Sequence, residues 1–172
     1  DMLASSIVIT DSQELADNVV REVEKQLLQL PRQEIARAAL EQNGMIIVAS
    51  DIYEALDFAN QSAPEHMELL TENPFQFLSY VHHAGAVFLG AYSPEPLGDY
   101  FAGPNHVLPT GGTARYYSVL NVETFMKRTS IISYTQPALQ ESADDVIRLA
   151  EAEGLQAHAN AVRLRRKCYA EV

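Results

Sequence analysis

The 172-residue sequence has little positive charge, a single cysteine and no long apolar run. It contains 12 Lys and Arg against 23 Asp and Glu, giving a formal net charge of -11 at pH 7. Nucleic-acid binding needs clustered Lys and Arg, so this balance argues against a nucleic acid as partner. No apolar run is long enough to cross a bilayer, and the N-terminus has no signal-peptide pattern. We therefore expect neither a membrane anchor nor secretion.

Cysteine is scarce enough to exclude an internal disulfide, because Cys168 stands alone. We expect an incidental thiol in a reducing, cytoplasmic compartment. Positive charge gathers only at the C-terminal end, at Arg163, Arg165, Arg166 and Lys167. Such a run is more typical of the solvated end of a helix than of a binding patch. The remaining composition, 47% hydrophobic and 20% charged, is that of a soluble globular protein.

Strands alternate with helices over the first two thirds of the sequence. Short β-branched or apolar runs predict strands over residues 6–10, 45–49 and 85–89, the last two of the kind buried on both faces. Helical spacing or helix-start residues predict helices over residues 13–30, 32–42, 52–60 and 74–81. Alternation of this kind indicates an α/β fold, with a parallel sheet flanked by helices.

The regular alternation of strand and helix patterns ends after Gly90. Residues 91–112 hold four of the eight prolines and four of the eight glycines and show no clear period. A long irregular segment with Asp, Asn, His and aromatic residues favours a functional loop. Beyond it the pattern predicts a short helix over 122–127, a strand over 131–134 and two helices over 137–153 and 157–169. We expect residues 1–120 to belong to the α/β domain and residues 121–172 to form a small helical tail.

Glu65 and His66 are the first candidates for chemistry. Pro64 suits the first position of a helix, which would place both residues in a first helical turn. Adjacent carboxylate and imidazole groups can move protons near neutral pH. The alternative is that Glu65 merely favours a helix N-terminus and that His66 is a surface or packed residue.

Asp99 and His106 form a second candidate pair, seven residues apart on a glycine-rich loop. Both could approach one metal ion or one substrate. Ordinary loop chemistry is the alternative interpretation. Glu153 and His158, at the junction of the last two helices, give a weaker signal, because Glu followed by Gly is common at helix ends. We interpret His82 and His83 as polar exposure at the end of a helix.

Several of these residues stand in blocks whose order and separation resemble the histidinol dehydrogenase family along nearly the whole chain. The blocks are Pro64-Glu65-His66-Met67-Glu68, then Ala84-Gly85-x-Val87-Phe88-Leu89-Gly90, then Gly98-Asp99-Tyr100-x-x-Gly103-x-Asn105-His106-Val107-Leu108-Pro109-Thr110, then Phe125-x-Lys127-Arg128, and finally Ala152-Glu153-Gly154-Leu155-x-Ala157-His158. Several motifs in order are far more specific than any one of them alone.

The resemblance implies an enzyme that oxidises L-histidinol to L-histidine in two NAD-dependent steps, with zinc orienting the substrate. It assigns Glu65 as the base that activates water, and His66 as the base that takes the hydroxyl proton and contacts substrate. It makes Asp99 and His158 zinc ligands that also contact substrate, and His106 and Glu153 substrate-binding residues. It further implies an incomplete Rossmann-like sheet and a homodimer whose tails cross, so that Glu153 and His158 would serve the partner's site.

The family also has features that this sequence lacks. A Gln-Ala-Glu-His motif with two more zinc ligands would precede Asp1, and the main NAD-binding residues would precede it as well. No glycine-rich dinucleotide fingerprint occurs here, so we assign no cofactor-binding residue and expect the chain to be inactive alone. One alternative is a non-catalytic module for metal binding and dimerisation. Another is an unrelated zinc hydrolase with Glu65 as base, Asp99 and His158 on the metal and His106 as a third ligand. The absence of an HExxH helix disfavours it.

Overall fold

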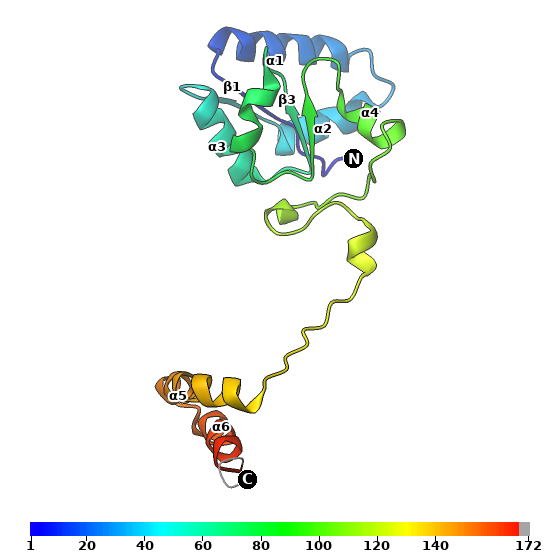
Figure 1. Cartoon of the computed structure of the whole chain (residues 1–172). Helices are drawn as coiled ribbons and strands as arrows, with labels where there is room; N and C mark the ends of the chain where they lie inside the picture. Colours follow the sequence, from blue (N-terminus) through cyan, green and yellow to red (C-terminus); the bar gives the residue numbers. More distant parts are fainter. Residues whose placement is uncertain (169–172) are drawn as a thin grey trace. The chain divides into compact units, whose positions relative to one another are not determined.

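The computed structural model describes residues 1–168, which fold as two compact units, Asp1–Phe125 and a second unit from Met126 onward (Figure 1). The first unit contains strands β1 (Ile7–Thr10), β2 (Met45–Val48), β3 (His66–Leu69) and β4 (Ala86–Leu89), helices α1 (Gln13–Leu27), α2 (Gln33–Asn43), α3 (Ile52–Ser62) and α4 (Glu95–Tyr100), and 3₁₀ turns at Pro74–Tyr80, Thr113–Arg115 and Val122–Phe125. The second unit contains helices α5 (Gln136–Ala152) and α6 (Gln156–Cys168).

The strands pair in parallel, which confirms the predicted α/β class. β1 pairs with β2, with Ile7 opposite Met45, and β3 pairs with β4, with His66 opposite Ala86. Within the described residues these are two separate two-stranded sheets rather than one continuous sheet. Helices connect the strands of the β1–β2 pair, as parallel pairing requires.

Local sequence signals explain where the helices begin. The Ser12 hydroxyl accepts a hydrogen bond from the Leu15 N–H at the start of α1, and the Asp51 carboxylate accepts two at the start of α3. Such caps satisfy N–H groups that have no partner within the helix. Beside α3, a core of Leu56, Leu69 and Phe77 joins that helix to β3 and to the 3₁₀ turn. This core therefore holds β3, the strand that begins at His66, against α3.

The predicted helix beginning at Pro64 is wrong. Instead α3 ends at Ser62, Ala63 takes a left-handed conformation with φ of 47°, and β3 begins at His66. Proline commonly follows a helix end because it cannot continue the helix. Burial then alternates along β3, with Met67 and Leu69 buried. A period of two belongs to a strand, and it outweighed the helix-start signal of the proline.

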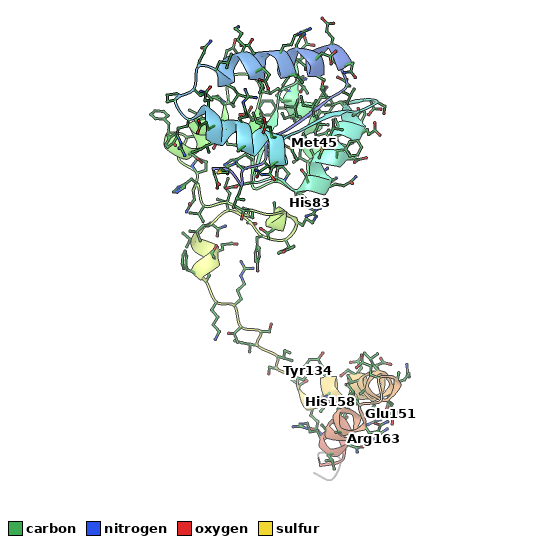
Figure 2. The ribbon with its side chains drawn as sticks, turned by 180° about the vertical axis from the view of Figure 1, so that it is seen from behind. Met45, His83, Tyr134, Glu151, His158 and Arg163 are labelled. Carbon is green, nitrogen blue, oxygen red and sulfur yellow. The ribbon has the colours of Figure 1, made fainter. Side chains whose placement is uncertain are left out.

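The expectation that residues 45–49 form a strand buried on both faces is also wrong. Met45 and Val48, the two ends of β2, are 55% and 44% exposed (Figure 2 labels Met45). The physical reason is that β2 pairs only with β1 among the described residues, so one of its edges carries no strand. A strand without a neighbour on one side also lacks the cross-strand side chains that would pack beside its own, so the ends of β2 stay exposed.

Three smaller predictions differ from the structure. The predicted α-helix over residues 74–81 is a 3₁₀ turn over Pro74–Tyr80, and the segment 91–112 contains the short helix α4, which the pattern did not predict. Residues 131–134 form no strand, and Ile131 and Ile132 are 91% and 83% exposed. A strand needs a neighbour for its backbone hydrogen bonds, and this segment has none in the described chain.

The second unit is a helical hairpin that turns at Gly154, whose φ is 74°. Ile147, Ala150 and Ala159 form its buried contact. The Arg163 guanidinium of α6 pairs with the Glu151 carboxylate of α5, which Figure 2 labels. Arg166 pairs in the same way with Asp144, so two residues of the C-terminal basic run face acidic partners. The predicted end of α6, Tyr169, lies outside the described residues.

None of the helices in residues 1–168 combines the length and the hydrophobicity that crossing a membrane would require.

Candidate functional site

His66 is the first residue of β3, directly after the turn that ends α3. Because side chains alternate along a strand, His66 and Glu68 share the face opposite the buried Met67 and Leu69. The His66 side chain is 27% exposed. Its Nε2 atom is nevertheless buried and has no hydrogen-bond partner among the described residues. A buried nitrogen without a partner is a feature that a ligand, a proton or a metal ion can satisfy.

Helix α4 brings two carboxylates to this nitrogen. Glu95 Oε1 lies 3.5 Å and Asp99 Oδ1 lies 3.9 Å from His66 Nε2. Glu95 and Asp99 are four residues apart, which places them on one face of the helix. The backbone N–H of Glu95 also donates to Glu68 Oε1 at 2.8 Å, linking α4 to β3. We call His66, Glu95 and Asp99 the His66 cluster.

Glu95 was not among the residues that the sequence singled out. A search for acidic residues at i−4 from Asp99 would have found it, but only if residues 95–100 had been recognised as a helix. Pro94, Pro96 and Gly98 made this segment resemble a loop.

The His66 cluster is suited to a metal ion. One ligand atom from each residue lies within 4.8 Å of the others. A histidine nitrogen with two carboxylate oxygens is a donor set that zinc accepts. Asp99, the zinc ligand that the resemblance assigns in this unit, therefore lies among donor atoms of the kind that zinc accepts.

The surroundings of Glu95, Asp99 among them, alter the pKa of the Glu95 carboxyl. Burial raises the pKa of the Glu95 carboxyl above its ordinary value, the nearby charge of Asp99 raises this pKa further, and His66 opposes both effects. Placing a like charge beside a partly buried carboxylate disfavours its ionised form. The cluster therefore holds two negative groups at a cost that a bound cation would reduce.

This cost predicts that Glu95→Gln raises the thermal midpoint of the chain at pH 7 by about 1–2 °C. Because the folded-state pKa of Glu95 is raised, its ionised form destabilises the fold above the ordinary pKa, and the effect disappears below that value. The wild-type and variant midpoints should therefore converge at about pH 4. Circular dichroism melts at both pH values test this, with the exposed Glu72→Gln as the matched control. A gap of the same size at both pH values would contradict the prediction.

A groove of about 490 Å³ runs beside α4, and we call it the α4 groove. Both Asp99 and His106 line it, so the structure brings these two predicted residues to one hollow. The ring of Phe88, another lining residue, lies 6.0 Å from the His66 ring. A Cβ atom at Gly98 would stand 2.7 Å from this phenylalanine ring, so the glycine allows α4 to approach β4 closely.

Glu65 lies next to the cluster in sequence but is not one of its members. It is half-buried, and its carbonyl oxygen accepts a hydrogen bond from the Ala86 N–H at 2.9 Å. This hydrogen bond therefore fixes the backbone of Glu65 directly before β3, where that strand begins to pair with β4.

Gly85 is packed so closely against Glu65 that a side chain would not fit. A Cβ atom there would lie 2.6 Å from the Glu65 carbonyl oxygen and 3.1 Å from Pro109 Cδ. We expect Gly85→Ala to destabilise the first unit by about 1–3 kcal/mol, because the backbone itself must move. Urea denaturation followed by circular dichroism measures this. Gly103→Ala is a less crowded comparison, since its Cβ would meet nothing within 4 Å, although its positive φ adds some strain. Equal losses for the two variants would show that crowding at Gly85 is not the cause.

Glu153 and His158 belong to the second unit. Both are exposed, Glu153 as the residue that ends α5 and His158 in the first turn of α6. They stand on either side of Gly154, the turn of the hairpin. The structure thus places the six predicted site residues in two groups, four in the first unit and these two in the second.

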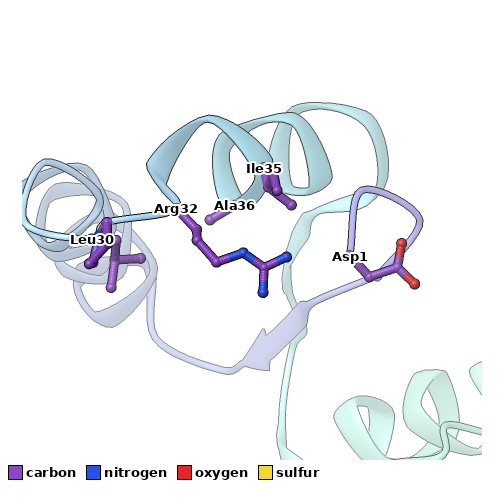
Figure 3. A pocket seen from close by; sticks show the side chains of 6 residues that line it. Asp1, Leu30, Arg32, Ile35 and Ala36 are labelled. Atoms are coloured by element: carbon purple, nitrogen blue, oxygen red, sulfur yellow. The ribbon is translucent and has the colours of Figure 1, made fainter.

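A second hollow, of about 330 Å³, lies between the end of α1 and α2 (Figure 3). Its lining is largely apolar, with Leu30, Pro31, Ile35 and Ala36 beside Asp1 and Arg32. It contains no histidine and only one carboxylate side chain, so it offers less chemistry than the α4 groove.

The fold and the site together define an α/β protein with a histidine and two carboxylates gathered beside a groove. Comparison with known proteins is more specific. The family model for histidinol dehydrogenase matches residues 1–166. Histidinol dehydrogenase of Heliobacterium mobile is 54% identical over 165 residues, covering 96% of this chain and 39% of that protein. Histidinol dehydrogenase of Bacillus subtilis is 53% identical over 167 residues, covering 97% of this chain and 39% of that protein.

A solved structure agrees. The crystal structure of histidinol dehydrogenase from Elizabethkingia anophelis superimposes with a TM-score of 0.74 at 40% identity, covering 94% of this chain and 37% of that one. The chain belongs to the histidinol dehydrogenase family, as the sequence motifs predicted, and it matches the C-terminal portion of that family. It spans about two fifths of the length of the curated relatives that it matches.

Proposed function

We propose that this chain supplies the acid–base residues and part of the zinc site of an enzyme that oxidises L-histidinol to L-histidine with NAD. The observation that carries the proposal is the position of the His66 imidazole, whose buried Nε2 lies 3.9 Å from Asp99 Oδ1, in a member of the histidinol dehydrogenase family. A base must lie close to the group that binds its substrate, and this pair meets that condition.

In this proposal each residue has a limited task. His66 takes the hydroxyl proton of the substrate, and Glu65 takes a proton from the water that attacks the aldehyde. Asp99 and His158 hold zinc, and His106 and Glu153 bind substrate. When bound, zinc would orient the imidazole and amine of histidinol, and NAD would accept the hydride. A histidine is suited to the first task because an imidazole exchanges protons near neutral pH.

The division of the site between two units fits a homodimer with crossing tails. Glu153 and His158 lie in the helical hairpin, whereas His66 and Asp99 lie in the α/β unit. We propose that the hairpin of one subunit completes the site of the other. We also propose that the two strand pairs belong to a larger, Rossmann-like sheet in the complete enzyme, and that the enzyme works in the cytoplasm.

NADH absorbance tests the proposal directly. We expect no signal when this chain alone is mixed with L-histidinol, NAD and zinc. We expect a signal when it is combined with the part of the Heliobacterium mobile relative that the match does not cover. We call this combination the complemented enzyme. Asp99→Asn in the complemented enzyme should lower activity and zinc content together. Turnover by the chain alone would show that it holds NAD and zinc by other residues.

A non-catalytic module for metal binding and dimerisation is the second candidate, and the cluster of His66, Glu95 and Asp99 favours it. It predicts zinc binding by the chain and no NADH signal in any combination. The complemented enzyme therefore separates the two candidates.

A further inference from the structure

We propose that Glu95 is a positioning residue for His66, and that its carboxylate accepts a hydrogen bond from the imidazole and fixes the orientation of the ring. The proposal rests on the proposed function, which makes His66 the base for the hydroxyl proton. Glu95 is the one member of the His66 cluster to which that function gives no task.

The first argument is the geometry of the cluster. Glu95 Oε1 lies nearer to His66 Nε2 than Asp99 Oδ1 does, at 3.5 Å against 3.9 Å. Neither separation is yet a good hydrogen bond. Contacts at active sites are often long without substrate and shorten when it binds. Of the two contacts, the one with Glu95 is nearer to hydrogen-bond length.

The second argument is that Glu95 is itself held in place. Its backbone N–H donates to Glu68 Oε1, and Glu68 shares the face of β3 with His66. Close packing of Gly98 against Phe88 fixes the same helix one turn further on. A group that orients a catalytic ring must be rigid, and Glu95 is anchored to the strand that carries the ring.

The third argument concerns the two carboxylates. Asp99 lines the α4 groove together with His106, whereas Glu95 is not part of that lining. If Asp99 binds the metal ion, its oxygen atoms are directed to the ion and serve the imidazole poorly. Glu95 is then the carboxylate that remains for the ring. A carboxylate behind a catalytic histidine holds the ring in the productive tautomer and orientation.

Two variants distinguish the loss of the hydrogen-bond acceptor from a change in the size of the side chain. Glu95→Leu keeps an apolar side chain of similar size and removes the acceptor, while Glu95→Gln keeps one acceptor oxygen and removes the charge. In the complemented enzyme we expect kcat to fall about 10–100-fold for Glu95→Leu and less for Glu95→Gln. KM for L-histidinol should stay within about twofold in both, because substrate binding does not use Glu95. Glu72→Gln, an exposed carboxylate in the same unit, should match the wild type.

A second measurement uses this chain alone and needs no activity. In long-range ¹H–¹⁵N spectra of the histidine rings, we expect His66 to show one dominant tautomer with its hydrogen on Nε2, which leaves Nδ1 as the nitrogen that takes the hydroxyl proton. Glu95→Leu should move the His66 ring signals and leave those of His106 and His158 in place. Zinc affinity of the chain, measured by calorimetry, should change less than twofold.

Three results would overturn the proposal. Unchanged His66 ring signals in Glu95→Leu would show that the carboxylate does not orient the imidazole. A loss of zinc affinity equal to that of Asp99→Asn would make Glu95 a metal ligand instead. An active wild-type complemented enzyme with unchanged kcat in Glu95→Leu would exclude a positioning role. An inactive wild-type complemented enzyme would count against the proposed function, and the ring spectra would still decide the contact with Glu95.

Discussion

His66→Asn is expected to lower kcat for histidinol oxidation in the complemented enzyme by about 10²–10⁴-fold. Asparagine has similar bulk and can still form hydrogen bonds, but its amide cannot take up a proton near neutral pH. His66 occupies the first position of β3, where its backbone is fixed by pairing with β4, so the substitution should leave the fold intact. The strand needs only an extended residue there.

The measurement is steady-state NADH formation with L-histidinol as substrate. His82→Asn is the matched control, because His82 is exposed and lies in the same unit outside the His66 cluster. We expect the control to retain wild-type kcat and zinc content. Full activity of His66→Asn would mean that another group takes the hydroxyl proton, and the role given to His66 would have to be abandoned.

Asn60→Leu is expected to destabilise the first unit by about 2–4 kcal/mol. Asn60 is 8% exposed, and its side chain makes three hydrogen bonds to the backbone. Its Nδ2 donates to the Tyr80 carbonyl at 2.7 Å, and its Oδ1 accepts from the N–H groups of His82 and His83 at 2.8 and 3.2 Å. Leucine fills a similar volume but leaves all three backbone groups without partners.

Urea denaturation followed by circular dichroism measures the loss. Gln61→Leu, at the next and exposed position of α3, should change the free energy of unfolding by less than about 0.5 kcal/mol. Asn60→Asp should be intermediate, because it keeps the acceptor for the two histidine N–H groups and loses the donor to Tyr80. Identical midpoints for Asn60→Leu and Gln61→Leu would show that these hydrogen bonds contribute nothing net.

Periodicity along the chain predicted the α/β class and the position of most strands and helices, since apolar spacing reports which face of an element is buried. It failed where two signals competed. At Pro64 a helix-start signal hid a strand, and at residues 95–100 two prolines and a glycine hid a helix. Residues 131–134 have the composition of a strand but no neighbour to pair with. Local sequence cannot reveal whether a partner strand exists.

The candidate site was predictable in part, and mostly through motifs. His66 and Asp99 were named from the sequence, and the structure places them 3.9 Å apart. Glu95 required knowledge that α4 is a helix, because only helical spacing relates it to Asp99. Asn60 gave no signal at all, since an asparagine in a helix has the same letter whether it faces water or binds the backbone of a distant segment. Its role depends on contacts with residues twenty or more positions away.

Both carboxylates of the His66 cluster lie on one helix of six residues, α4. A movement of helix α4 therefore displaces Asp99 and Glu95 together. The segment Gly90–Pro94, which joins this helix to β4, sets the position of both groups relative to the imidazole. A change of length there would move both carboxylates relative to the imidazole together, whereas a point substitution on the helix can change one of them alone.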